Sequence, residues 1–555
     1  MAATLELVRK RIERAGTTGG EQLDRFVTAL LGRADDSFFE VFDGEALYAM
    51  AVDGLKFLRS LQGGLKVQVY NPTFEADGWT SPYTVVRLLM GDRPFIVDSV
   101  QAELGRQNLE LTYQLHPIID VGRSQDGTLF DLEVDGADRA EAFEMFFISK
   151  LEDAALPAVA ARLTEVLTDV IRATDDYQAI RTMARSVSQQ LGALAGGDAA
   201  GASAGDASSE EIVEYRAFMD WLDDDNFVFL GYREYAILTI DGEPSLGTVT
   251  ESGLGILRNV EQSGYTQPVP LKDIPQQLRE RVTSGRLLVV TKTNAEATVH
   301  RARRMDYVGF KRLAADGTVV GEQRFLGLFT SKAQSTQVDD IPILRRKLRQ
   351  VLERDEALPG SHDYKAIVAA FNSMPREDLF SSDSEQLQKD IRAILSLEQE
   401  RGARLRIRPD PLKRGIGAMV VMPRESFNGE VRRAIQDFLQ QRLKATRVDY
   451  RLALGEDQSH ARFHFYFVTD IDPATIDATE LERTVIELAR TWREELRERL
   501  IETHGEVRGR ELARRYEAAF DEGYEAEVSP GQAVHDIANL EKLADRGNVF
   551  DLVNP

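Results

Sequence analysis

The chain has 555 residues, more than one ordinary hydrophobic core serves, so its length predicts three or four structural units. Its 43% hydrophobic and 29% charged content is typical of globular proteins, and no apolar run reaches the roughly 18 residues that cross a bilayer. The absence of cysteine excludes zinc–thiolate, iron–sulfur and thiol chemistry. A net charge of −23 repels phosphate backbones and anionic lipid, so neither nucleic acid nor a membrane is expected as a partner.

Residues 1–60 are expected to form a helical lead-in. Leu47, Ala51, Leu55 and Leu58 recur at spacings of three and four residues, which places one apolar stripe on a helix. The start, "MAATLELVRKRIERAG", lacks an apolar signal segment with a small-residue cleavage site. A cytoplasmic location is therefore expected.

Residues 61–191 are predicted to form a first module of order β-α-β-β-α with covering helices. The run "TVVRLLM" (84–90) is almost continuously apolar, the pattern of a strand with both faces covered, and a helix follows from Pro94. The stretch "LELTYQLHP" alternates apolar and polar residues, as a half-buried strand does, and "FEMFFISKL" indicates another strand. Two helical stretches then cover about 156–194.

Residues 192–209 contain almost only Gly, Ala, Ser and Asp, so they predict a flexible linker. Residues 210–335 contain strand-like runs with Asp-Gly turns at 241–242 and 316–317, which predicts a second, strand-rich unit. Residues 336–402 are expected to form a helical connector.

Residues 403–505 repeat the first module in outline. The loop from Met422 to Phe427, "MPRESF", has the spacing of "MGDRPF" from Met90 to Phe95. A strand with alternating phenylalanines, "ARFHFYFV", follows, and then one long helix from about 478 to 502. A helical tail, 506–555, completes the chain. The expected fold class is α+β and multidomain, with repeated β-α-β-β-α (ACT or ferredoxin-like) modules joined by helical segments.

Motifs for catalysis, cofactor binding and metal binding are not found. The stretches "GLGILR" and "GIGAMV" lack the third glycine of a dinucleotide-binding turn, and no phosphate loop, HExxH pair or GxSxG elbow occurs. His460 and His464 lack further local ligands, so both are interpreted as surface histidines, as is His116. No catalytic, cofactor-binding or metal-binding residue is therefore assigned.

The loop "GDRP" that links the apolar strand to the helix has two interpretations. Gly91 permits close approach, Arg93 adds a positive charge, and helix N–H groups attract a carboxylate, so an amino acid or 2-oxo acid could bind there. Alternatively, Asp92 and Arg93 only solvate a turn, and Asp98 occupies a wet face of the helix. Taken alone, the loop favours the structural interpretation.

Two further charged segments have structural interpretations. The arginine-rich hairpin "HRARRMDYVGFKR" (300–312) is expected to form an ion-pair network with neighbouring acids in so acidic a chain. The stripe along the long helix after 478 is interpreted as a core or partner-helix face.

Several of these motifs together resemble the N-terminal region of the large-type bacterial NAD-specific glutamate dehydrogenases. They are "RPFIVDSVQAELGRQNLELTYQLHPIIDVGR", "WLDDDNFVFLGYREY", "GLGILR", "MDYVGFKRLAADGTVVGEQRFLGLFTS", "IPILRRKLRQVLER" and "GSHDYKAI", in this order from about 80 to 470. The resemblance implies ACT-type modules joined by helices, with residues 210–335 as a second ACT-like unit. It also implies a parent enzyme that converts L-glutamate and NAD to 2-oxoglutarate, ammonia and NADH. It implies NAD for the parent, and no cofactor in this chain.

The resemblance also implies that the catalytic region lies beyond residue 555. The expected function is therefore regulatory and assembly-related, with a homo-oligomer formed through the ACT-like modules. The alternatives are a free-standing amino-acid-sensing ACT protein and a ligand-free oligomerisation arm; an in-frame continuation in the DNA after codon 555 would distinguish them from the first interpretation.

In ACT-type modules, amino-acid effectors commonly sit at the loop between the first strand and the first helix. By this resemblance the regulatory site would comprise Gly91, Asp92 and Arg93, supported by Asp98 and Ser99. The corresponding loop of the later module lies at Arg424-Glu425.

Overall fold

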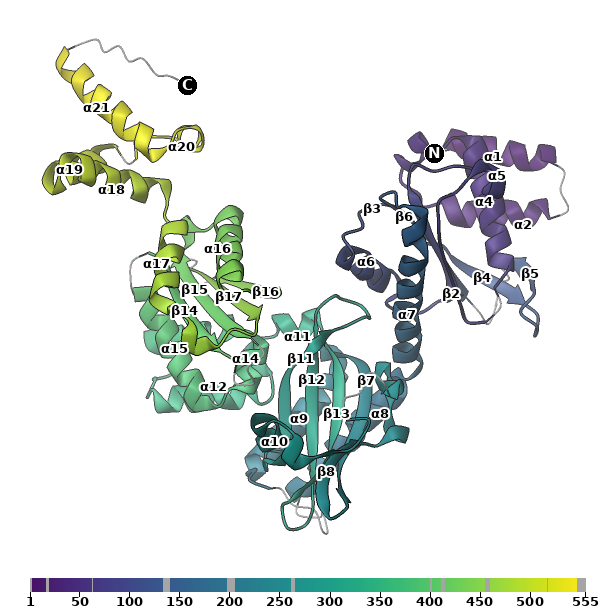
Figure 1. Ribbon diagram of the computed structural model, residues 1–555, viewed down its shortest axis with the longest axis horizontal. Coiled ribbons are helices and arrows are strands. Elements are labelled where there is room, and N and C mark those ends of the chain that lie inside the picture. Colours follow the sequence, from purple (N-terminus) through teal and green to yellow (C-terminus); the bar gives the residue numbers. More distant parts are fainter. Residues whose placement is uncertain are drawn as a thin grey trace. The chain divides into compact units, whose positions relative to one another are not determined.

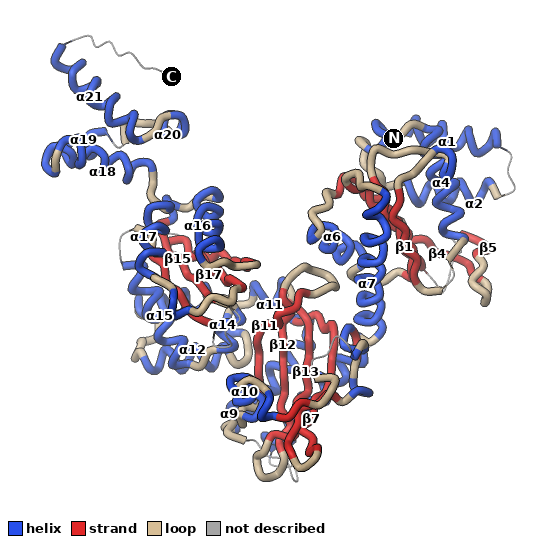
Figure 2. The backbone as a smooth tube through the Cα atoms, viewed as in Figure 1, coloured by secondary structure: helices blue, strands red, loops and turns tan. Residues whose placement is uncertain are grey.

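The computed structural model describes residues 2–15, 19–61, 63–132, 140–196, 205–260, 265–399, 402–410, 415–454, 460–516 and 518–546. The chain divides into two compact units, Met1–Ser335 and Thr336–Pro555. Helices and antiparallel sheets make up the described parts of the chain (Figures 1 and 2). The α+β, multidomain fold class with ACT modules is confirmed.

The first sheet lies between two layers of helices. Its strands run in the order β1-β2-β6-β4-β5, and β3 also pairs with β6. On β6, Phe143 and Phe147 join the core of helices α1–α4, whereas Ala142 and Phe146 join the core under α6 and α7. Both faces of the central strands are thus covered, as the run 84–90 predicts. The elements are α1 (Ala2–Ala15), α2 (Gly20–Leu31), α3 (Phe38–Val41), α4 (Gly44–Arg59), β1 (Leu65–Tyr70), α5 (Phe74–Asp77), β2 (Thr84–Gly91), α6 (Ile96–Arg106), β3 (Leu111–Leu115), β4 (Ile118–Arg123), β5 (Leu129–Leu132), β6 (Ala140–Ile148) and α7 (Leu156–Asp175).

Helices α6 and α7 are buried on two sides. The apolar cluster that contains Val100 of α6 and Leu163 of α7 also contains Ile256, Leu326 and Leu328 from the strand-rich sheet. Helix α7 packs on β1 of the first sheet and on the strand-rich sheet, and α6 packs on α7. One continuous core joins the first module to the strand-rich part.

The strand-rich part has a connectivity of its own. Its sheet order is β10-β8-β7-β13-β12-β11, with β9 on β7, whereas in the other two sheets a helix follows the second strand. Of the linker predicted at 192–209, residues 192–196 continue helix α8, and residues 197–204 lie outside the described residues. The elements are α8 (Tyr177–Gly196), α9 (Ser209–Trp221), β7 (Phe227–Ile240), β8 (Glu243–Thr248), β9 (Leu254–Gly255), β10 (Val269–Pro270), α10 (Gln276–Thr283), β11 (Leu288–Glu296), β12 (Arg304–Leu313), β13 (Val319–Phe329) and α11 (Ser331–Ser335).

The second unit contains a smaller copy of the first module. Its sheet order, β14-β15-β17-β16, matches the order β1-β2-β6-β3 in the first sheet, and α16 stands where α6 does. Phe463, Phe465 and Phe467 face the core with α16 and α17, as their alternation predicts. The elements are α12 (Leu344–Arg354), α13 (His362–Ser373), α14 (Arg376–Ser381), α15 (Ser384–Gln399), β14 (Arg404–Pro409), β15 (Ile416–Pro423), α16 (Gly429–Arg442), β16 (Arg447–Leu454), β17 (His460–Val468) and α17 (Ala478–Leu488).

The long helix predicted over 478–502 is wrong, because the chain breaks between two helices there. Thr491 caps a new helix and forms a capping box with Glu494, which satisfies free N–H groups at the helix start. Leu481 therefore packs in the sheet module, and Leu496 in a separate helical core. The later helices are α18 (Trp492–His504), α19 (Glu506–Tyr516), α20 (Glu522–Glu527) and α21 (Pro530–Arg546).

Candidate functional site

The loop between β2 and α6 is held at both ends. The N–H group of Asp92 donates to the carbonyl of Ala140, at 2.9 Å, which fixes the loop to the start of β6. At the other end, Phe95 adopts φ 74°, a left-handed conformation that is uncommon for a bulky residue. Such a conformation persists only where surrounding contacts impose it.

Arg93 is directed toward the C-terminal end of α7. Its Nη1 atom lies 2.8 Å from Asp175 Oδ1 and 3.0 Å from Thr174 Oγ1. A cation at this position also interacts favourably with the negative end of the helix dipole. The guanidinium proposed to hold a ligand carboxylate is therefore engaged within the first module.

Asp98 and Ser99 contact the hairpin between β11 and β12. Asp98 Oδ2 lies 2.8 Å from His300 Nδ1, and the N–H group of His300 donates to Ser99 Oγ at 2.9 Å. The His300 ring packs 4.9 Å from the ring of Phe95. Ser99 is fully buried. The structure thus brings two of the sequence-predicted site residues, Asp98 and Ser99, onto a segment some 200 positions later in the same chain, whereas Arg93 is directed to α7.

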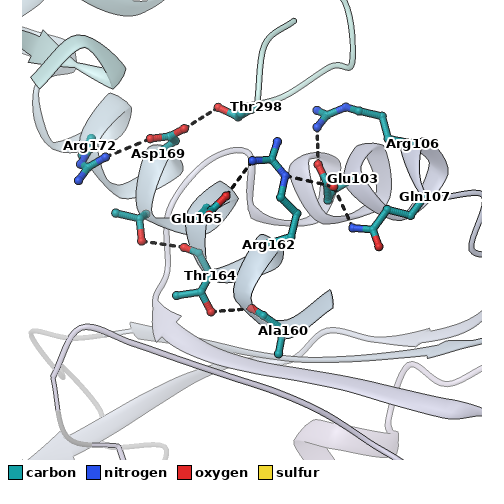
Figure 3. Close-up of polar contacts among 11 residues, drawn as sticks. Glu103, Arg106, Gln107, Ala160, Arg162, Thr164, Glu165, Asp169, Arg172 and Thr298 are labelled. Carbon is teal, nitrogen blue, oxygen red and sulfur yellow. Dashed lines mark hydrogen bonds and ion pairs between the residues drawn. The ribbon is translucent and has the colours of Figure 1, made fainter. Parts of the chain in front are cut away.

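A polar network extends this contact along α6 and α7 (Figure 3). The buried carboxylate of Glu103 accepts from Gln107 at 2.9 Å and pairs with Arg106 and Arg162. Thr298 of the hairpin donates to Asp169 at 2.9 Å. Burial raises the pKa of Asp169, while Thr298 and Arg172 counteract the rise.

Residues of the arginine-rich hairpin form ion pairs and hydrogen bonds with neighbouring side chains, in agreement with the predicted ion-pair network. Lys292 pairs with Asp306 at 2.8 Å, and Arg312 with Glu234 at 3.3 Å. Arg301 donates to Ser331 at 3.1 Å.

Glu144 is a functional candidate that sequence reasoning missed. It lies on β6 under α6 and is 3% exposed; Gln114 donates to it at 3.4 Å, and Gln101 donates to Gln114 at 2.8 Å. Burial raises the pKa of Glu144 to about 8, with Asp92 adding to the rise and Gln114 opposing it. A lone glutamate inside the apolar run "FEMFFI" was the signal that could have identified it.

The corresponding loop of the second module has more exposed charged residues than the β2–α6 loop. Arg424 and Glu425 are exposed, and the Arg424 guanidinium lies 5.0 Å above the ring of Phe427. Asn428 caps α16 by accepting from the N–H groups of Glu430 and Val431.

In the "GLGILR" motif, Gly255 allows two backbone segments to pack closely. Gly255 adopts φ 62° and ψ −137°, and a Cβ atom there would lie 2.1 Å from the carbonyl of Leu230. Its N–H group donates to Asp176 at 2.8 Å. The motif therefore fixes β9 against β7.

The histidines differ from one another. His116 is exposed, as expected, but the surface interpretation of His464 is wrong: it is 8% exposed, and burial together with Arg451, Arg462 and Arg408 lowers its pKa to about 3. The described residues contain no cluster of His, Asp and Glu suited to a metal ion. Nor does any helix in that part of the chain have the length and apolarity to cross a membrane.

The sequence matches four domain families of glutamate dehydrogenase. They are the ACT1 domain at residues 26–167, helical motif 1 at 341–401, the ACT2 domain at 404–493 and helical motif 2 at 499–543. The two ACT matches fall on the first and last sheets described above.

Three relatives are named NAD-specific glutamate dehydrogenase. The Halomonas elongata protein is 33% identical over 86% of this chain and 29% of its own length. The Pseudomonas aeruginosa protein is 29% identical over 87% of this chain and 29% of its own length. The Mycobacterium tuberculosis protein is 28% identical over 81% of this chain and 27% of its own length. The chain thus spans under a third of each relative's length, and by its ACT and helical-motif domains it belongs to the family of large NAD-specific glutamate dehydrogenases.

Proposed function

We propose that this chain is the N-terminal regulatory and assembly region of an NAD-dependent glutamate dehydrogenase, with hydride transfer located in a further part of the polypeptide. The observation that carries the proposal is the position of the matches: ACT and helical-motif domains match residues 26–167 and most of 341–543, and the aligned region covers 29% of the first relative's length. The described sheets also support it, since their pairings are antiparallel, whereas a dinucleotide-binding sheet is mostly parallel.

The first test is enzymatic. Purified chain incubated with L-glutamate and NAD is expected to form no NADH, because none of the assigned domains orients a nicotinamide. Absorbance at the NADH band measures this, with a full-length relative as the positive control. Turnover above that of heat-treated chain would contradict the assignment.

We further propose that the chain self-associates through its sheet edges. Strand β16 is an edge of the second ACT sheet and exposes Tyr450 and Leu452, and unpaired edges are commonly covered by a copy of the same module. Light scattering after size exclusion is expected to show an oligomer that the double variant Tyr450→Lys, Leu452→Lys disrupts. Leu358→Lys, which changes an exposed leucine in a loop, is the matched control. A strict monomer at every concentration would remove this proposal.

An amino-acid effector at the β2–α6 loop stays a prediction. The carboxylate of a bound zwitterion would compete with Asp175, at the C-terminal end of α7, for the guanidinium of Arg93. Calorimetric titration of wild type and Arg93→Glu with glutamate, aspartate and 2-oxoglutarate tests this. The charge reversal is expected to weaken binding by about 1.5–3 kcal/mol; equal binding by both proteins would place the site elsewhere, with Arg424-Glu425 the next loop to test.

A further inference from the structure

The second ACT sheet has one apolar face and one basic face. Its apolar face packs on α16 and α17, while on the other face Arg406, Met419, His464 and Arg451 form one row across four strands. Helix α13 and the α13–α14 turn cover this basic face: Arg451 Nη1 donates to the carbonyl of Met374 at 3.2 Å. Within the row His464 is buried, and Arg451 is partly covered by the α13–α14 turn.

Acidic partners are concentrated at one end of this face. Arg408 pairs with Asp378 and, at 2.9 Å, with Asp390, which also lies 3.5 Å from Arg406. At the other end, the neutral carbonyls of Met374 and Ala369 accept from Arg451 and Arg462. Arg451 thus has a backbone carbonyl as its hydrogen-bond acceptor, and burial lowers the pKa of Arg451 while the charge of Glu377 opposes that lowering.

Arg376, the first residue of α14, adds a further cation to that end. It is 4% exposed, and its Nη2 atom donates to the carbonyl of Thr336 at 2.6 Å. Its Nε and Nη1 atoms are buried without a hydrogen-bond partner in the described structure, as is His464 Nε2. Burial, together with the nearby charge of Arg451, lowers the pKa of Arg376 to about 10. The guanidinium therefore stays charged at neutral pH.

Burying two N–H donors of a charged group costs free energy when no acceptor forms a hydrogen bond with them. A water molecule could accept from one of them, but it would leave the repulsion between Arg376 and Arg451 in place. An anion would satisfy the donors and offset the charge together, and guanidinium groups match carboxylate and phosphate oxygens in geometry.

We propose that a small oxyanion, a carboxylate or a phosphate, binds in this buried cluster, accepting hydrogen bonds from Arg376 with Arg451 and His464 beside it. Because Arg376 begins α14 and Arg451 belongs to β16, the anion would join the helical motif to the ACT2 sheet. Its occupancy would then control how firmly these two domains pack. All the residues of this cluster belong to the second unit.

The test is thermal unfolding of the full chain in phosphate or acetate, against chloride at equal ionic strength. In wild type, one of the two oxyanions is expected to raise the unfolding temperature of the second unit in a saturable way, and the comparison shows which chemistry the site prefers. Arg376→Met is expected to weaken the apparent affinity at least about tenfold, as loss of a charge-assisted hydrogen bond does. Arg433→Met, which removes an exposed arginine from α16, is the matched control.

Equal responses to the oxyanions and chloride, or equal losses in Arg376→Met and Arg433→Met, would overturn the proposal. Since Arg376→Met removes a buried group and can impair folding, a second measurement uses wild type alone. A crystal soaked in selenate is expected to show an anomalous peak within hydrogen-bond distance of Arg376. A soaked crystal without a peak at that place would also overturn it.

Discussion

Replacing Arg123 by methionine is expected to lower the free energy of unfolding of the first unit by about 3–5 kcal/mol, the range for breaking a buried ion pair. Arg123 on β4 and Glu141 on β6 are 3% and 0% exposed in their side chains, and two bonds of 2.8 Å join them. Arg123 also donates to the carbonyls of Leu58 and Gly127. Methionine keeps much of the apolar stem but leaves the Glu141 carboxylate buried without this charge partner.

Urea unfolding followed by circular dichroism measures this loss. Lys10→Met removes an exposed pair with Glu6 in the same unit, and should change stability by about 1 kcal/mol or less. If the two variants lose similar amounts, the buried pair does not stabilise the first unit as argued.

Glu144→Gln is expected to stabilise the first unit at pH 8 by a few kcal/mol, and much less at pH 5. The folded-state pKa of about 8 exceeds the ordinary value of 4.5, so the folded protein binds more protons between these values. Stability should therefore fall as pH rises from about 4.5 to about 8, by at most roughly 1.4 kcal/mol per pH unit. Glutamine has nearly the same shape and stays neutral, so it removes this dependence.

The measurement is urea unfolding of wild type and variant at pH 5 and pH 8. Glu110→Gln, which changes an exposed glutamate in the same module, is the control. A difference between wild type and Glu144→Gln that is the same at both pH values would show that Glu144 does not titrate in this range.

Periodicity predicted the elements that bury one or two regular faces. The run at 84–90 and the alternating phenylalanines of β17 behave as their patterns indicate. Periodicity failed at residues 489–491, because the apolar stripe keeps its spacing across the break. The sequence feature that marks the break is the capping pair Thr491 and Glu494, which starts a new helix although the apolar spacing continues.

The candidate site was less predictable than the fold. A local pattern identified the β2–α6 loop, but docking of His300 joins residues about 200 positions apart, and no spacing within either segment encodes it. The covering of the basic face of the second sheet could not be predicted for a related reason. Alternation along β17 identifies two faces of the strand, but it carries no information on whether helices pack against the charged face.

The core shared by α6, α7 and the strand-rich sheet has a practical meaning for handling this protein. The two segments on either side of the Gly/Ala/Ser stretch, 1–196 and 205–335, each contribute part of that core. Expressed separately, each half would present a broad apolar surface to water and would be expected to aggregate. Any dissection of the chain should therefore keep residues 1–335 together, and place its boundary near 336, where the first compact unit ends.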